Sequence, residues 1–363
     1  MGDPVTPPAI LSELRVAHFR CIGSAELTFD PRINLFTGGN AAGKTSLLEA
    51  IYLLGRGRSF RAADNRVLIQ SGQPSAEIGG KVRDATGSRQ VGVRVAPGGL
   101  EIHIQGTSGG TVAELASALP VQAIHADIGS LVQGPPESRR RILDWGVFHV
   151  EHSYLDSWRR FRRTLAQRNS ALREGAADAV VAAWDEAIAE AAAAVDRLRR
   201  QHLEILQPMV EELGRQLLDA PVFLNYLPGW AGDAPLQAAL LANREGDRQA
   251  GYTRIGPHRA DLRLDVAGEV SRWRASRGQQ KLLGAALVLA QSMTVTRQLQ
   301  RPIALLVDEP AADLDAGRLR EFLRLILAIP AQVFFASITR EGFDPAMAGA
   351  MFHVEHGEAN ALL

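Results

Sequence analysis

A glycine-rich segment reads Gly38-Gly39-Asn40-Ala41-Ala42-Gly43-Lys44-Thr45-Ser46 and separates two apolar runs, residues 33–36 and 47–54. This order predicts a strand, a loop and a helix, which is the context in which the pattern G-x-x-x-x-G-K-[ST] binds nucleotide phosphates. The two fixed glycines permit backbone conformations and close approaches that a Cβ would prevent. Loop N–H groups and the helix N-terminus should face the phosphates. Lys44 should reach the β- and γ-phosphates, and Thr45 should ligate Mg²⁺.

A second candidate element is a pair of carboxylates, Asp308 and Glu309, at the end of the apolar run 303–307. The run predicts a buried strand, and ligands of doubly wound sheets bind at the carboxyl ends of strands. We therefore expect Asp308 to hold Mg²⁺ and its water shell. Glu309 beside it is the candidate general base for an attacking water.

A third element is Ser276-Arg277-Gly278-Gln279-Gln280, which opens the apolar run 282–293. Ser276 can cap the predicted helix, and with Gly278 it offers a hydroxyl and N–H groups to a γ-phosphate. Alone this pattern has little specificity, because many helices begin with serine. Its position between the two elements above makes the set of three informative.

The ordered set resembles the head of the ABC/SMC/Rad50-type P-loop ATPases, with Walker A at 38–45, the signature at 276–280, Walker B at 303–309 and a D-loop at 313–315 that contains Asp313 and Asp315. The resemblance implies an α/β head that is split in sequence by a short helical lobe. It also implies that Ser276, Gly278 and Gln279 of one subunit complete the ATP site of another. The expected assembly is an ATP-dependent homodimer that uses ATP and Mg²⁺.

Finer detail resembles the RecF family of bacterial recombination mediators. The runs that carry this likeness are 14–22, 47–54, 139–148, 167–169, 256–262 and 276–281, so it spans nearly the whole chain. It implies an ATP-dependent DNA clamp whose weak, DNA-stimulated ATPase acts as a switch. Such a protein would bind gapped, single-stranded or double-stranded DNA, act with RecO and RecR, help to load RecA and support SOS induction.

Some site residues are carried over from the resemblance alone. Gln122 is the candidate Q-loop contact to Mg²⁺, and Arg20 is a candidate phosphate contact. The segment after the last predicted core strand, residues 336–339, offers no switch histidine. Candidate DNA contacts are Arg56, Arg58, Arg61, Arg139, Arg140 and Arg141, with further arginines over 159–163. Each cluster has the alternative interpretation of a solvated helix face, and only the family likeness favours DNA.

The predicted organisation has three parts: the N-terminal part of the head over 1–110, the helical lobe over 111–220 and the C-terminal part of the head over 221–363. The head should open with a hairpin over 11–29 and a meander over 76–105 joined to the core sheet. In the lobe we expect helices over 137–150 and 153–173, then an Ala-rich helix that Pro208 ends or kinks. Later strands are expected at 222–227, 262–266 and 332–337, with an edge strand near 351–354.

Bulk properties limit the alternatives. The 363 residues hold 40 Lys+Arg and 40 Asp+Glu, so DNA would have to be held by local basic patches. One cysteine, no apolar run of spanning length and no signal peptide predict a cytoplasmic protein without a membrane partner.

The rival function is a nucleotide-binding subunit of a membrane transporter, which rarely carries so large an Arg-rich lobe. A P-loop kinase would leave residues 276–280 without a purpose. The sequence Phe-His-Val-Glu-His occurs twice, at 148–152 and 352–356, and we interpret the repeat as coincidence and not as a metal site.

Overall fold

The computed structural model describes residues 10–84, 87–231, 234–267, 269–270, 276–338 and 349–362. Its contacts divide the chain into two compact units, unit 1 (Met1–Ile128 and Thr296–Leu363) and unit 2 (Gly129–Val295). These boundaries fall at other residues than the predicted ones at 110/111 and 220/221. The reason is that α2 (Val112–Ala118) and β8 (Val121–Ile124) pack on unit 1, whereas the strands after residue 220 pack on helices of unit 2.

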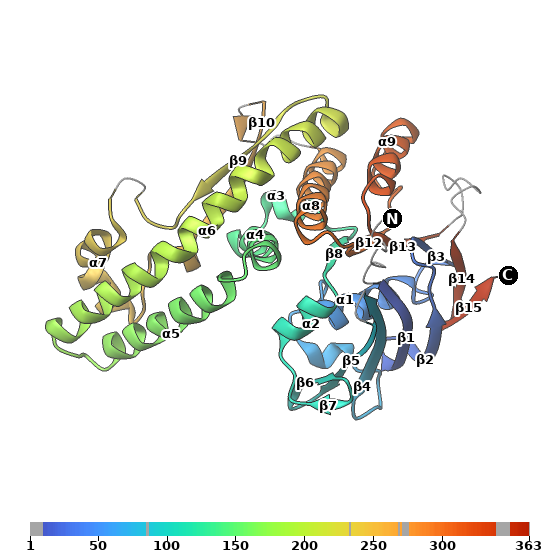
Figure 1. Cartoon of the computed structure of the whole chain (residues 1–363), viewed down its shortest axis with the longest axis horizontal. Helices are drawn as coiled ribbons and strands as arrows, with labels where there is room; N and C mark the ends of the chain where they lie inside the picture. Colours follow the sequence, from blue (N-terminus) through green and yellow to red (C-terminus); the bar gives the residue numbers. More distant parts are fainter. Residues whose placement is uncertain are drawn as a thin grey trace, which may run out of the picture. The chain divides into compact units, whose positions relative to one another are not determined.

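The core sheet of unit 1 carries the predicted Walker strands (Figure 1). Among the described residues it has six strands in the order β15-β14-β3-β13-β12-β8, all parallel except β15. Besides β8, they are β3 (Ile33–Thr37), β12 (Ala304–Asp308), β13 (Gln332–Ser337), β14 (Ala350–Glu355) and β15 (Glu358–Leu362). The expectation of an edge strand near 351–354 is wrong, because β15 pairs with β14 and takes the edge. Strand β8 was not predicted at all.

A second, antiparallel sheet holds the N-terminal hairpin and the meander. Its order is β2-β1-β4-β5-β6-β7. The strands are β1 (Ile10–Phe19), β2 (Ile22–Thr28), β4 (Ala76–Asp84), β5 (Gly87–Ala96), β6 (Gly99–Ile104) and β7 (Thr107–Ser108). The meander therefore extends the hairpin and not the core sheet, which corrects the prediction. Alternation of apolar and polar residues gives this sheet one buried and one solvated face.

Helix α1 (Lys44–Arg56) packs against both sheets (Figure 1). It is buried around most of its circumference, as expected of a helix enclosed on several sides. Phe29 stands edge-on to three rings of the core sheet, Phe36, Phe334 and Phe352. One apolar core thus joins the two sheets and holds the N-terminus of α1 at the end of β3. The remaining helices of unit 1 are η1 (Asn65–Leu68) and α9 (Ala316–Leu327).

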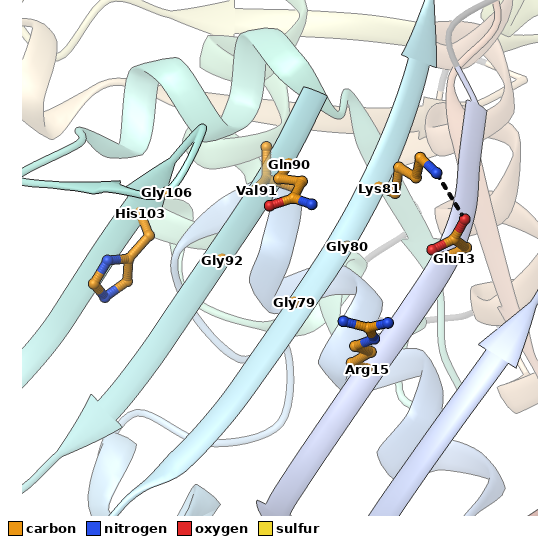
Figure 2. Close-up of a pocket in the computed structure, with 10 residues that line it drawn as sticks. All are labelled: Glu13, Arg15, Gly79, Gly80, Lys81, Gln90, Val91, Gly92, His103 and Gly106. Carbon is orange, nitrogen blue, oxygen red and sulfur yellow. Dashed lines mark hydrogen bonds and ion pairs between the residues drawn. The ribbon is translucent and has the colours of Figure 1, made fainter. Parts of the chain in front are cut away.

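The solvated face of the second sheet is hollowed at its centre (Figure 2). Gly79 and Gly92 lie opposite each other on β4 and β5, so two neighbouring positions carry no side chain. The hollow, of about 210 Å³, is bordered by Arg15 and His103 and by the ion pair of Lys81 with Glu13 (3.0 Å). It contains none of the predicted nucleotide-site residues.

Unit 2 consists of helices with a small sheet, β11-β10-β9. Its elements are α3 (Ser130–Gln133), α4 (Pro136–Val150), α5 (Tyr154–Arg173), α6 (Asp178–Leu218), β9 (Val222–Leu227), α7 (Leu236–Ala250), η2 (Pro257–Arg259), β10 (Asp261–Val266), β11 (Glu269–Val270) and most of α8 (Arg277–Leu299). Pro208 does not end α6, contrary to one form of the prediction. Val210, Leu213 and Leu217 beyond it are buried, and their burial favours continued helix despite the hydrogen bond that proline removes.

Buried ion pairs connect the helices of unit 2. Arg168 is fully buried and contacts Asp185 (2.7 Å) and Asp247 (2.8 Å). Arg199 contacts Asp144 at 2.8 Å and donates to the carbonyl of Pro257. Because a buried arginine that loses its partner leaves an uncompensated charge, loss of any of these aspartates should destabilise the packing of α4, α5, α6 and α7.

Candidate nucleotide-binding site

The glycine-rich loop adopts a conformation that few residues other than glycine tolerate. Gly38 has φ 152°, Gly43 has φ 120° and Ala41 between them has φ 61°. The Lys44 ammonium donates to the carbonyls of Gly38 and Gly39, each at 2.8 Å. The loop is thus wound around its own lysine, with Lys44 at the start of α1.

Thr45 and Asp308 meet although they are far apart in sequence. The Thr45 hydroxyl lies 3.0 and 3.1 Å from the two carboxylate oxygens of Asp308, and it donates to that carboxylate. The topology brings them together because β3 and β12 both flank β13, and Asp308 is the last residue of β12. Burial raises the pKa of Asp308, although the Thr45 hydrogen bond and the nearby Lys44 and Arg61 charges oppose the shift.

Glu309 completes this cluster from the other side. Its carboxylate lies 3.5 Å from the Lys44 ammonium, and its side chain is 26% exposed. Its backbone has φ 47°, a left-handed conformation that is costly for a glutamate, and its N–H donates to the carbonyl of Ala336 at 2.9 Å. The charge of Glu309 also raises the pKa of Asp308.

Replacing the buried carboxylate of Asp308 should stabilise the nucleotide-free protein. An acid whose folded pKa is raised favours folding below its unfolded pKa, near 3.8 for Asp308, and loses that contribution as the pH rises through the folded pKa. Asp308→Asn keeps an acceptor for Thr45 but carries no charge. In thermal unfolding without nucleotide, we compare the melting temperatures of Asp308→Asn and the unaltered protein. We expect the advantage of the variant to grow as the pH rises above 3.8 and then to level off. A difference that does not vary with pH would contradict this.

A hollow of about 600 Å³ lies above the loop. Its lining comprises Arg20, Cys21, residues 41–46, Arg61, Val67 and Ile69. Arg61 was predicted to contact DNA, but the structure places it here, near enough to lower the pKa of Asp308. Arg61 therefore belongs with the groups that can face nucleotide phosphates, and its contact with DNA stays a prediction.

Arg20 lines the same hollow, but its guanidinium is held by Glu49. Two nitrogens of Arg20 donate to the Glu49 carboxylate at 2.9 and 2.8 Å, and a third donates to the Val67 carbonyl at 3.1 Å. Glu49 is fully buried in α1 and also accepts from the Ser59 hydroxyl. Sequence reasoning missed Glu49; its signal was a lone carboxylate within the apolar run that follows the loop.

Gln122 does not lie where a Q-loop contact to Mg²⁺ would be needed. It is in β8, opposite Leu305 of β12, three residues before Asp308. Three residues span roughly 10 Å of strand, and an odd separation puts the two side chains on opposite faces. The structure therefore does not bring Gln122 to the carboxylate end of the sheet, and this corrects the expectation.

The signature residues belong to unit 2, at the start of α8. The Ser276 N–H donates to the Gln279 side chain at 2.9 Å, and the Gln279 N–H donates to the Ser276 hydroxyl at 3.3 Å. This reciprocal pair is a capping box, so Ser276 and Gln279 fix the direction of the first turn. Ser276 and Gln279 are exposed, and Gly278 between them is half-buried.

The D-loop aspartates have different roles in the structure. Asp315 caps α9 by accepting from the N–H groups of Gly317 and Arg318, both at 2.9 Å. These bonds lower the pKa of its carboxyl. Asp313 has φ 63°, which turns the chain between β12 and α9. The two aspartates thus shape the short segment that connects β12 to α9.

Loss of the signature serine should separate nucleotide binding from assembly. In Ser276→Arg a long cation replaces the hydroxyl at the exposed start of α8, while the loop of unit 1 is unchanged. We expect ATP affinity to stay within about twofold of that of the unaltered protein, and the ATP-dependent dimer that the resemblance implies to be lost. Calorimetry and light scattering would measure the two properties. If Ser276→Arg formed a dimer with ATP at the same protein concentration as the unaltered protein, Ser276 would have no role in the site of a second subunit.

Most arginines predicted to contact DNA are engaged within the protein. Arg139 is 2% exposed, pairs with Asp261 at 2.8 Å and donates to carbonyls of residues 131 and 134, so it is unavailable to DNA. Arg140 is half-buried and donates to the Ala260 carbonyl, and burial lowers its pKa. Arg141 is exposed and pairs with Glu137. In unit 1 the Arg56 guanidinium lies 5.6 Å from the Tyr52 ring centroid, and Arg58 is half-buried.

In the part of the chain that the structure describes, no group of three or more His, Cys, Asp or Glu could hold a metal ion by itself. The two Phe-His-Val-Glu-His copies lie in different elements: the first ends α4, and the second lies in β14 and the turn after it. A hydroxyl and a carboxylate, as in Thr45 and Asp308, do fit Mg²⁺ bound together with nucleotide phosphates, since this ion keeps several waters.

Comparison with known proteins agrees with this geometry. The family described as RecF/RecN/SMC N terminal domain matches residues 10–360. The DNA replication and repair protein RecF of Stutzerimonas stutzeri (strain A1501) is 41% identical over 360 residues, 97% of each chain. The chain belongs to the RecF family. RecF of Pseudomonas fluorescens (strain Pf-5) is 40% identical over 355 residues, 96% of this chain and 97% of that one.

Solved structures confirm the fold class. The recombination mediator RecF with ATP superposes with a TM-score of 0.87 and 24% identity, covering 98% of both chains. An Smc head bound to the C-winged helix domain of ScpA superposes with a TM-score of 0.59 and 17% identity, covering 97% of this chain and 96% of that one. The RecF relatives do not favour the transporter alternative. None of the helices within the described ranges is long and apolar enough to cross a membrane.

Proposed function

We propose that the chain is an ATP-dependent DNA-binding protein of replication and recombinational repair. The observation that carries the proposal is the convergence of Lys44, Thr45, Asp308 and Glu309 at the carboxyl end of one sheet. The names of the RecF relatives, and the ATP in one RecF structure, support the nucleotide and the pathway.

In this proposal each residue of the site has a separate role in binding or hydrolysing ATP. Phosphate oxygens replace the carbonyls of Gly38 and Gly39 as partners of the Lys44 ammonium. Thr45 and Asp308 hold Mg²⁺, which when bound neutralises charge on the phosphates. Glu309 orients and deprotonates a water, and Arg61 adds positive charge beside the phosphates. Residues 38–46 supply N–H groups to the same anion.

Assembly follows from the position of the signature. Ser276, Gly278 and Gln279 lie on exposed or half-exposed surface at a helix N-terminus, where N–H groups favour an anion. We infer that they meet the γ-phosphate held by a second copy, so that two ATP molecules join a homodimer. Slow hydrolysis then returns the monomers. Asp313 and Asp315 shape the segment beside that interface.

DNA contact is assigned to exposed arginines rather than to Arg139. Helix α5 carries four of them on its solvated surface, Arg159, Arg160, Arg162 and Arg163, and the first two also form exposed ion pairs, with Asp156 and Glu190. Contacts of this kind neutralise phosphates and make binding salt-dependent and largely indifferent to sequence. The proposed substrate is DNA at single-strand gaps, where the dimer acts with RecO and RecR in loading RecA and in supporting SOS induction. The cytoplasm is the proposed location.

The deciding experiment uses Glu309→Gln protein and fluorescently labelled gapped DNA. Anisotropy is measured with ATP·Mg²⁺ and with ADP·Mg²⁺ at increasing salt. We expect the protein to bind DNA with ATP and at least about tenfold more weakly with ADP. The logarithm of the DNA-binding constant should fall linearly with the logarithm of the salt concentration. Absence of DNA binding in both states, with ATP still bound, would overturn the DNA function and leave a bare ATPase.

A further inference from the structure

The turn between β14 and β15, residues 355–358, lies against the phosphate-binding loop although the two segments are far apart in sequence. The Gly357 N–H donates to the Ala42 carbonyl at 2.9 Å. Upstream, β14 pairs with β3 as far as His353 opposite Thr37, and the Thr37 hydroxyl donates to the Phe352 carbonyl at 3.2 Å. Strand β14 thus pairs with β3 up to the last residue of β3, and the residues of β14 that follow lie beside the loop.

The packing of β14 against the loop leaves no room for a side chain at Gly38. A Cβ on Gly38 would lie 2.1 Å from the Val354 carbonyl oxygen, so the backbone of β14 occupies the space that a side chain would need. A Cβ on Gly43 would lie 3.5 Å from the Val354 side chain and 2.9 Å from that of Ile22. The backbone of β14 therefore requires glycine at position 38, in addition to any need for phosphate approach. At position 43 only the end of the Ile22 side chain would have to move, and the requirement for glycine there comes from its φ of 120°.

The turn itself demands glycine at its second position. His356 has φ 50° and Gly357 has φ 82°, and Glu355 pairs with Glu358 across them, which is the pattern of a two-residue hairpin with both central residues left-handed. A Cβ on Gly357 would lie 2.1 Å from the carbonyl oxygen of Cys21, in the turn between β1 and β2. Gly357 is therefore wedged between the loop and a second backbone segment.

The hydrogen bond from Gly357 has a geometric consequence for the loop. In a planar trans peptide the carbonyl and the following N–H point in opposite directions. The Ala42 carbonyl points to Gly357, so the Gly43 N–H points away from the turn, and Gly43 lines the hollow above the loop.

We propose that the β14–β15 turn is a positioning element of the nucleotide site, in which Gly357 fixes the direction of the Gly43 N–H toward the phosphates. The inference rests on the proposed ATP binding, and it adds a residue that no nucleotide-binding motif includes. The turn does not touch the nucleotide itself: it acts through the Ala42–Gly43 peptide.

The test compares two alanine variants with the same backbone strain. Gly357→Ala puts a Cβ against Cys21, so the turn must move and release the Ala42 carbonyl. Gly72→Ala is the matched control, because Gly72 has φ 83° and a Cβ added there would meet no heavy atom within 4 Å. For Gly357→Ala we expect the ATP dissociation constant to rise about tenfold, or about 1.4 kcal/mol, and amide exchange of residues 38–46 to accelerate. Gly72→Ala should change neither.

The controls separate failure of this inference from failure of ATP binding. If the unaltered protein binds ATP and Lys44→Met does not, but Gly357→Ala binds as tightly as the unaltered protein, the turn has no positioning role. If the unaltered protein binds no ATP, the proposed function itself fails. Should Gly357→Ala not fold, Thr37→Val decides, since it removes only the bond to Phe352: severalfold weaker ATP binding supports the proposal, and unchanged affinity refutes it.

Discussion

Lys44→Met is expected to weaken ATP binding by at least about 100-fold, roughly 2.7 kcal/mol. Lys44 is 4% exposed, and its ammonium lies at the centre of the loop, where it is the only cation that donates to loop carbonyls among the described residues. Charge-assisted bonds to phosphate formed in so buried a position are among the strongest that proteins make. Methionine has nearly the same length but offers neither charge nor donor. Calorimetric titration with ATP·Mg²⁺ measures the effect.

A matched lysine tests whether the loss is specific to the loop. Lys81 belongs to the same unit, but its side chain is 34% exposed and pairs with Glu13 on the solvated face of the second sheet. Lys81→Met should leave ATP affinity within about twofold, since an exposed ion pair contributes about 0–1 kcal/mol to stability and is remote from the loop. If Lys44→Met bound ATP as tightly as Lys81→Met does, the proposal that residues 38–46 bind the phosphates would have no basis.

Short motifs with obligatory backbone geometry were predictable from sequence. The loop at 38–46 required a preceding strand and a following helix, and β3 and α1 have these positions. Asp308 at the end of an apolar run was predicted for the same reason: the run is β12 and the aspartate ends it. In such segments local pattern and global fold agree, so a few residues determine the local structure.

Features that depend on pairing between distant segments were not predictable. The short strand β8 is one of them, because its four residues gain a partner only from β12. That register moves Gln122 away from the place that a resemblance assigned to it. The surroundings of Arg139 and Arg61 were not predictable for the same reason. In a basic run of the sequence, an arginine that pairs with a buried aspartate, as Arg139 does with Asp261, cannot be told from one that lines a hollow, as Arg61 does.

Glu309→Gln is expected to reduce ATP hydrolysis by about 10²–10⁴-fold while ATP binding persists, so that the ATP-bound dimer accumulates. Glutamine keeps the shape of the side chain and an oxygen that can accept from Lys44, so the loop should hold its conformation. It cannot accept a proton from water. Single-turnover hydrolysis and light scattering with ATP·Mg²⁺ measure the two effects.

The charge removed by this substitution also acts on Asp308, the proposed ligand of Mg²⁺. Glu309 raises the pKa of Asp308, so its neutralisation lowers that pKa and favours the ionised carboxylate that Mg²⁺ requires. ATP·Mg²⁺ should therefore bind Glu309→Gln at least as tightly as the unaltered protein. Glu26→Gln, at an exposed position on the second sheet, is the control and should change neither property. Hydrolysis that persists in Glu309→Gln would assign the general base elsewhere, and weaker ATP binding would make Glu309 part of the binding site instead.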